Sequence, residues 1–288
     1  MSTRTIGIWM ALAAAVLFGL SVVTAADVFA SVSPMGAAQI RSVLAAVILS
    51  AIAYRRRLTA NRGQLWWLAL LGLNLALVTV ASYLAIERLG VGPGSTIQFT
   101  GPVLVLAWMR LVEKRPVPHV AWLVAGAAVI GTGLMTQAWD GDLDGLGVAA
   151  GVVAAFTFAS YLVLGERLGA ALPSLTVLAY GFAFSALIWV VVLPPQWSGL
   201  GTGAWARLVF IATIGTVAPF LLEISALRRA DPGSVGVVAT AEPVVGAAVA
   251  WVALGQALTP VQLVGGLVTV IAIAGIHHVT SRRTTWPG

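Results

Sequence analysis

The sequence predicts an all-α integral membrane protein with ten transmembrane helices in two inverted five-helix repeats. Three observations predict this class: ten apolar stretches, an uneven placement of basic residues, and a likeness between the two halves of the chain. The chain is 59% hydrophobic and 9% charged, whereas soluble domains carry about 25% charged residues. Backbone polar groups inside lipid must be satisfied within the spanning segment, so the apolar stretches are expected to be helices.

Each apolar stretch is long enough to cross a bilayer, which takes about 20 apolar residues in a helix. In chain order we predict spans at residues 6–25, 34–53, 64–86, 92–109, 119–136, 145–163, 173–193, 205–226, 232–253 and 259–279.

The first five spans have recognisable starts and features. The first follows Arg4, and because its apolar run is longer than the core of a signal peptide, we expect it to be retained. Pro34 opens the second span, and Trp66 lies at the start of the third, near the interface where indoles gather. Pro102 lies midway along the fourth span. Gly131 in the fifth is a small residue that lets two helices pack closely.

The last five spans repeat these features. The sixth follows an acidic tract at residues 140–144, which we interpret as an extracytoplasmic linker. Pro173 opens the seventh span, and Trp205 starts the eighth at an interface. Pro243 lies midway along the ninth span, and Gly265 is a close-packing position in the tenth.

Positive charge is concentrated on one side of the predicted membrane. Ten crossings put both termini and every second loop on that side, which then carries thirteen of the sixteen Lys and Arg residues: Arg4, Arg55, Arg56, Arg57, Arg62, Arg110, Lys114, Arg115, Arg167, Arg228, Arg229, Arg282 and Arg283. Cytoplasmic loops collect Lys and Arg, so the N and C termini are both predicted to be cytoplasmic.

The two halves of the chain align when it is shifted along itself by about 140 residues. Pro34 then falls near Pro173, and Pro102 aligns with Pro243. Each half contains five spans, so the second half must enter the membrane in the opposite orientation. Inverted repeats are typical of secondary transporters, with a site near the midplane between them. We place the repeats at residues 1–139 and 140–288.

Glu242 is the first candidate for contact with a solute, because an ionisable residue at the centre of a span usually faces a cavity. Pro243 follows it and donates no backbone hydrogen bond, which frees the carbonyl of Ala239. A carboxylate beside freed carbonyls could hold an ammonium group, or carry a coupling proton, since burial disfavours the charged form. The alternative is a Glu242 that only fixes helix packing, either protonated or paired with an arginine.

The fourth span contains a matching element. Gln98 either contacts the solute or makes an interhelical hydrogen bond. Gly101 lets another backbone approach closely. The predicted hinges are Gly101, Pro102, Pro219 and Pro243, since proline permits a helix to bend.

Glu223 lies near the cytoplasmic end of the eighth span. It either takes part in transport or forms a structural ion pair with Arg228 or Arg229 at the membrane edge. Polar residues within other spans are further candidates for solute binding, although each could instead only join helices: Asn74, Tyr83 and Tyr161.

Arg41 lies a few turns inside the extracytoplasmic end of the second span. It could meet a solute carboxylate, or it could pair with Asp27 or Glu87 from the same side of the membrane.

The sequence argues against several other classes of function. With no cysteine, the chain has no disulfide, thiolate nucleophile or thiolate metal site. It contains no phosphate-binding loop, metalloprotease or nucleophile-elbow motif, so we expect neither an enzyme nor a cofactor or metal. The basic residues lie at helix ends rather than on a polar domain, which argues against nucleic-acid binding.

Four short segments resemble the EamA-type branch of the drug/metabolite transporter superfamily. Residues 97–102 (IQFTGP), 218–223 (APFLLE), 241–243 (AEP) and 254–262 (LGQALTPVQ) are similar to segments of bacterial threonine/homoserine exporters. The family usually has Glu where this chain has Gln256, which puts an interaction at the cavity rim in doubt. The resemblance covers essentially the whole chain. It implies a central cavity lined by helices 1, 3, 4, 6, 8 and 9, with helices 5 and 10 packed together outside it.

The resemblance and the residues together favour a zwitterionic solute. A carrier of phosphorylated sugars should place several basic residues in its cavity, and this chain offers only Arg41. We therefore expect a bacterial inner-membrane exporter of small neutral amino acids. Threonine and homoserine are the foremost candidates, and aromatic amino acids or methionine form a wider range. The alternative is an exporter of apolar cationic drugs or other small metabolites. The residues leave open whether transport is proton-coupled or facilitated, and which protein partners exist.

Overall fold

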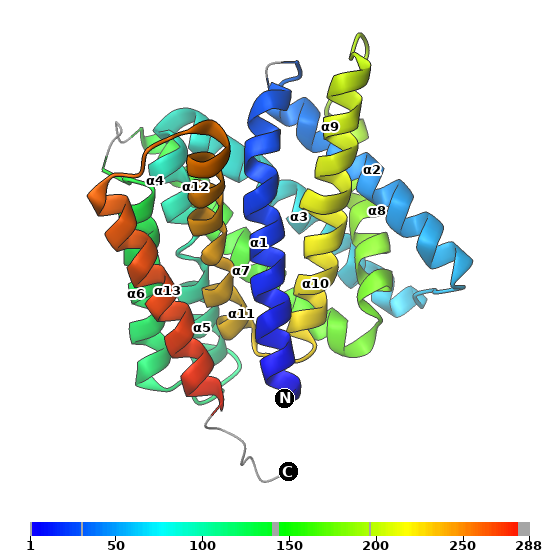
Figure 1. The fold of residues 1–288 in the computed structure, drawn as a ribbon. Coiled ribbons are helices and arrows are strands. Elements are labelled where there is room, and N and C mark those ends of the chain that lie inside the picture. The colour runs from blue at the N-terminus through cyan, green and yellow to red at the C-terminus, as the bar shows by residue number, and fades with distance from the viewer. Residues whose placement is uncertain (1, 30, 140–143, 196, 282–288) are drawn as a thin grey trace.

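The computed structural model describes residues 2–29, 31–139, 144–195 and 197–281. Within these ranges the chain is helical and contains no strand. The elements, shown in Figure 1, are α1 (Thr3–Phe29), α2 (Pro34–Arg55), α3 (Arg62–Leu89), α4 (Val91–Gln98), α5 (Gly101–Leu111), α6 (His119–Met135), α7 (Gly145–Ala171), α8 (Ser174–Val192), α9 (Thr202–Ala212), the π-helix η1 (Thr213–Val217), α10 (Ala218–Leu227), α11 (Pro232–Ala239), α12 (Ala241–Leu254) and α13 (Pro260–Ser281).

Each predicted span coincides with one helix or with consecutive short helices. The fourth span is divided into α4 and α5, the eighth into α9, η1 and α10, and the ninth into α11 and α12. Seven segments in the described part of the chain are long and apolar enough to cross a membrane, and α6 and the first part of α13 are shorter apolar helices. The count of ten crossings stays a prediction. Residues 140–143 of the predicted linker lie outside the described ranges.

Helix starts follow the chemistry of their capping residues. Asn61 accepts a hydrogen bond from the Gln64 backbone, and the Gln64 side chain accepts one from the Asn61 backbone, which forms a capping box at the start of α3. Asp144 caps α7 and Asp231 caps α11 in the same way, through a side-chain oxygen and a backbone N–H. The two aspartate caps place acidic residues at the N-terminal ends of apolar helices.

The first and sixth predicted spans run in opposite directions. α1 begins and α13 ends at the same end of the helix bundle, the lower end in Figure 1, which we call the terminal end. Gly7 near the start of α1 packs against Arg229, and Gly169 near the end of α7 packs against Arg228. α7 therefore ends where α1 begins, as inverted repeats require.

α6 and α13 pack tightly along each other at the edge of the bundle (Figure 1). A Cβ atom on Gly131 would lie 2.4 Å from Oγ1 of Thr269, and one on Gly265 would lie 2.4 Å from the backbone nitrogen of Met135. The prediction that glycines on these two spans are close-packing positions is confirmed. The two helices are the fifth and tenth predicted spans, which the family resemblance expects to be paired.

The main apolar core lies in the half of the bundle nearer the terminal end. It includes residues from the end of α2, the start of α3, the second half of α7, α10 and α11, with Leu49, Leu68, Leu162 and Ile224 fully buried. Two smaller clusters lie toward the opposite end, one around Ile40 and the other around Trp189. Burial is therefore unequal between the two ends of the molecule.

We expect Gly131→Ala to lower the free energy of unfolding by about 1–3 kcal/mol, the usual cost of overpacking. The added methyl group meets backbone as well as side chain, so α6 and α13 must move apart. Thermal unfolding in detergent measures the change. Gly126→Ala on the same helix is the matched control, because its Cβ would meet no atom within 4 Å. Equal melting temperatures for the two variants would contradict this packing.

Candidate functional site

The fourth and ninth predicted spans are both interrupted near their middle. α4 gives way to α5 at Phe99 and Thr100, and α11 gives way to α12 at Thr240. At both breaks a threonine hydroxyl donates to a carbonyl three residues earlier: Thr100 to Ile97 at 2.7 Å, and Thr240 to Val237 at 2.6 Å. Interrupted helices at equivalent places in inverted repeats are where carriers form solute sites.

Two of the predicted hinge prolines lie directly after these interruptions. Pro102 is the second residue of α5, and Pro243 is the third residue of α12. Gly101 is a position of close approach, since a Cβ there would lie 2.7 Å from the Phe158 ring. Its lack of a side chain therefore serves packing of α5 against α7.

Pro219 accommodates its missing hydrogen bond differently. It follows the π-helical turn η1, in which the Thr216 hydroxyl donates to the Ile211 carbonyl at 2.9 Å. Single π-helical turns are common at functional sites. Gly215 within the turn presses on α1, since its Cβ would lie 2.5 Å from that of Ser21. The turn is thus held against the first helix of the other repeat.

Glu242 lies in the first turn of α12, next to the break, and its side chain is partly exposed. The charges of Glu223 and Arg41 both act on its carboxylate. Gly19 of α1 lies against the Glu242 carbonyl, where a Cβ would come within 2.8 Å. Glu242 is therefore positioned by close backbone contact, within the electrostatic reach of one acidic and one basic side chain.

Arg41 extends from α2 toward α3. Its Nη2 lies 3.4 Å from Oγ1 of Thr79, and its Nε is buried without a hydrogen-bond partner. No ion pair joins Arg41 to Glu87 among the described residues, and the Asp27 side chain lies outside them. The guanidinium therefore retains N–H groups that could donate hydrogen bonds to a solute carboxylate.

Glu223 and Tyr161 form a buried pair. The Tyr161 hydroxyl donates to Oε2 of Glu223 at 3.0 Å, and the two residues are 2% and 4% exposed. Arg228 and Arg229 instead donate to the backbone carbonyls of Leu172 and Ser225. Glu223 is therefore held by a tyrosine on α7, and the alternative, an ion pair with the neighbouring arginines, does not form among the described residues.

Gln98 and Asn74 each make an interhelical hydrogen bond. Ser82 of α3 donates to Oε1 of Gln98 at 2.7 Å, which leaves the amide nitrogen of Gln98 as its donor toward a solute. Asn74 donates to Oγ of Ser160 at 2.7 Å and joins α3 to α7, while its Oδ1 is buried without a partner. Both residues serve helix contacts, and both keep one unused polar atom.

Tyr83 lies in a different environment from these residues. It packs against the cluster of Ala38, Ala76 and Trp189. Of the predicted solute-binding residues, the structure thus links Glu242 with Arg41 and Glu223, and Glu223 with Tyr161. It places Gln98, Asn74 and Tyr83 in separate contacts.

An aromatic cluster next to Glu223 was not predicted. The Phe220 ring contacts Phe18, Phe182 and Tyr161 edge to face, at centroid distances of 5.1, 5.3 and 5.6 Å. Phe220 follows Pro219 directly, so a proline-aromatic pair inside a span was the available signal. The cluster gives the site an apolar wall whose one polar tip, the Tyr161 hydroxyl, is held by Glu223.

Opposite charges also meet at the terminal end. Arg4 pairs with Asp231, and Arg115 donates to both oxygens of Glu166 at 2.8 and 3.1 Å. The Glu166 hydrogen bond raises the pKa of Arg115, which keeps its guanidinium charged. The sequence predicts only the side of the membrane on which these basic residues lie. It does not predict their partners, because residues far apart in the chain leave no local pattern. No group of three His, Asp or Glu residues in the described ranges is arranged to hold a metal ion.

Comparisons with known proteins agree with this architecture. Threonine/homoserine exporter RhtA of Escherichia coli (strain K12), and that of Salmonella typhimurium (strain LT2), are each 29% identical over 98% of this chain and 96% of their own length. An uncharacterized inner membrane transporter of Salmonella typhimurium, YicL, is 25% identical over 98% of both chains. One solved crystal structure shares the fold, with a TM-score of 0.80 and 17% identity over 97% of this chain and 99% of that one.

The family comparison matches both halves of the chain separately. The model of the EamA-like transporter family matches residues 5–137 and again residues 145–277. Each match contains one of the two interrupted spans described above. The chain, a multi-pass membrane protein built from two such repeats, belongs to the EamA-like transporter family.

Proposed function

We propose that this chain is a secondary exporter of small neutral amino acids, with threonine and homoserine foremost. The observation that carries the proposal is that the charge of Arg41, on α2, acts on the carboxylate of Glu242, in the first turn of α12. An amino-acid zwitterion carries the same two charges, so its ammonium can meet Glu242 while its carboxylate meets Arg41. The similarity to the threonine/homoserine exporter RhtA supports this solute class.

We propose ten crossings, with the terminal end in the cytoplasm and the repeats at residues 1–139 and 140–288. The distribution of Lys and Arg supports this orientation, because cytoplasmic loops collect them. The segment α4–α5 would be the fourth crossing, with α6 the fifth and α13 the tenth. A bacterial inner membrane is the compartment that fits the named relatives.

Transport would proceed by alternating access between the two halves. The interruptions at Thr100 and Thr240 separate each span into two short helices that can tilt independently, while Pro219 lies beside the π-helical turn. The Tyr161 hydrogen bond would hold Glu223 in place beside the aromatic wall. Glu242 would then be the carboxylate that the solute reaches.

An exporter of apolar cations is the second candidate. Two carboxylates at the site and the aromatic cluster around Phe220 favour an organic cation, which binds over aromatic faces. Arg41 disfavours it, because a second positive charge close to Glu242 repels a cation. A competition assay separates the two solute classes.

Labelled threonine should enter proteoliposomes that are preloaded with unlabelled threonine. We expect homoserine and serine to compete, and ethidium and methyl viologen to have no effect, because the site presents both signs of charge. Liposomes without protein give the background. If no amino acid exchanges, and the proteoliposomes instead take up ethidium or methyl viologen, the second candidate is favoured.

Glu242→Gln should reduce threonine exchange by about 10–100-fold, the value of one charge-assisted hydrogen bond of about 1.5–3 kcal/mol. Glu87→Gln is the control, since Glu87 is exposed near the end of α3. Size-exclusion chromatography in detergent checks that both variants remain monodisperse. Unchanged exchange by a monodisperse Glu242→Gln variant would remove Glu242 from the mechanism.

Tyr161→Phe should lower the free energy of unfolding by about 1–3 kcal/mol, because it leaves the buried Glu223 carboxyl without its donor. We also expect slower exchange, since Glu223 loses its fixed position. Tyr180→Phe on α8 is the matched control, because Tyr180 packs on the same core. Thermal unfolding and threonine exchange are measured for both variants. Equal melting temperatures and equal exchange rates for Tyr161→Phe and Tyr180→Phe would argue against the Tyr161–Glu223 pair.

A further inference from the structure

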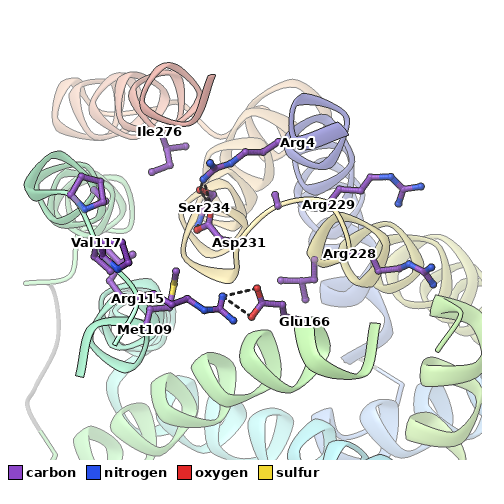
Figure 2. A pocket seen from close by; sticks show the side chains of 16 residues that line it. Arg4, Met109, Arg115, Val117, Glu166, Arg228, Arg229, Asp231, Ser234 and Ile276 are labelled. Atoms are coloured by element: carbon purple, nitrogen blue, oxygen red, sulfur yellow. Dashed lines mark hydrogen bonds and ion pairs between the residues drawn. The ribbon is translucent and has the colours of Figure 1, made fainter. Parts of the chain in front are cut away.

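A cavity of about 440 Å³ opens at the terminal end of the bundle. Its walls come from α1, α5, α6, α7, α10, α11, α13 and the segments that follow α5 and α10, so both repeats line it. Figure 2 shows Arg4 reaching toward Asp231 and Ser234 on one side of the cavity and Arg115 reaching toward Glu166 on another. The cavity is therefore lined by two pairs of opposite charges.

Each of these charge pairs joins the two repeats. Arg4 and Arg115 belong to the first repeat, while Asp231 and Glu166 belong to the second. A third ion pair, between Glu113 and Arg167 at 3.0 Å, also crosses between the repeats nearby. These side chains keep between 10% and 49% exposure. Ion pairs that water can reach exchange partners readily and contribute little to stability.

Above the cavity the two interrupted spans close against each other. α11 packs on α5, where a Cβ on Gly233 would lie 2.5 Å from the Leu106 side chain and one on Gly236 would lie 3.3 Å from Pro102. Every residue of α11 is buried. This contact separates the cavity from the region of Glu242.

The equivalent contact at the opposite end is missing. Inverted symmetry makes α4 and α12 the counterparts of α11 and α5, yet the described residues of α4 and α12 form no comparable packing. Most of α12 after Ala241 is partly or fully exposed, whereas α11 is fully buried. Carriers of this kind alternate by exchanging the conformations of their repeats. The structure is therefore the state that is closed at the terminal end.

We propose that the cavity is the entry site of the carrier, where a zwitterionic solute exchanges partners with the Arg115–Glu166 and Arg4–Asp231 pairs and so releases the contact between α5 and α11. This inference rests on the proposed amino-acid function. It adds a second solute site, at the terminal end, to the one near Glu242.

The charge balance explains why a zwitterion is the solute that opens the site. Its carboxylate can replace Glu166 on the planar guanidinium of Arg115, which binds carboxylates through two parallel hydrogen bonds. Its ammonium can at the same time meet the released Glu166 carboxylate. Both displaced charges then have a partner in the solute, whereas a solute with one charge would serve only one of them and leave Arg115 with Glu113 alone, whose Oε2 lies 2.9 Å from its Nε, or Glu166 with no partner.

The absence of cysteine from the chain permits a direct test. Val238, on the buried face between α11 and its neighbours, is 0% exposed, so Val238→Cys gives one thiol behind the closed contact. A membrane-impermeant thiol reagent is applied from the side of the terminal end, in vesicles of that orientation. We expect slow labelling that threonine accelerates several-fold, while lactate and ethanolamine, each with one of the two charges, do not.

Arg115→Gln in this background should raise the labelling rate several-fold without threonine and remove the threonine effect. Arg115→Lys, which keeps the positive charge between Glu166 and Glu113, should restore slow labelling, which a loss of folding could not do. Arg110→Gln is the matched control, since Arg110 is exposed on α5. Monodispersity in detergent is checked for each variant.

Labelling that neither threonine nor Arg115→Gln changes would overturn the entry site, and proteoliposomes that still exchange threonine would leave the proposed function standing. Labelling that rises in Arg115→Gln but responds to no amino acid would overturn the zwitterion as the ligand. If wild-type proteoliposomes also fail to exchange threonine, the proposed function is overturned as well.

Discussion

Interrupting a helix inside a bilayer is costly, because backbone groups there have no water to bind. This chain interrupts two helices at equivalent places, and the remaining features of the site depend on how the interruptions are covered. Threonine hydroxyls satisfy one carbonyl at each break, and prolines follow where a backbone donor is dispensable. The result is a pair of short helices in each repeat, and Glu242 lies in the first turn after one of the breaks.

The ionisable residues inside the bundle differ in what partners them. Glu223 is held by a tyrosine hydroxyl, and Glu242 feels a positive charge from Arg41. Arg41 keeps one buried nitrogen without a hydrogen-bond partner. A solute carboxylate could accept a hydrogen bond from this nitrogen without displacing a protein group. Burying an ionisable group in an apolar interior costs free energy, so such a residue is a candidate for function rather than for packing.

The two ends of the molecule differ in how they are closed. At the terminal end an apolar contact between α5 and α11 lies above ion pairs that water can reach. Apolar contact excludes water from the path to Glu242, whereas the ion pairs can be exchanged by a charged solute at little cost. Inverted repeats allow the same chain to reverse this asymmetry, because the two halves can adopt each other's conformations.

Much of the architecture follows from local sequence patterns. Apolar stretches, capping residues and prolines predict where helices lie, and the aligned Pro102 and Pro243 predict bends in the fourth and ninth spans, where the structure has breaks. Glu242 is identifiable because a charged residue in an apolar stretch is visible along the chain.

Only the tertiary structure decides which polar groups meet. Tyr161 and Glu223 lie 62 positions apart, and Arg4 and Asp231 lie 227 positions apart, so no spacing rule connects them. The sequence offers an ion pair with Arg228 or Arg229 as one of two roles for Glu223, because they are near in the chain, but both reach backbone carbonyls instead. Which end is closed is likewise absent from the pattern, since both repeats carry the same elements. Helix formation depends on neighbouring residues, whereas pairing across the bundle depends on how whole helices pack.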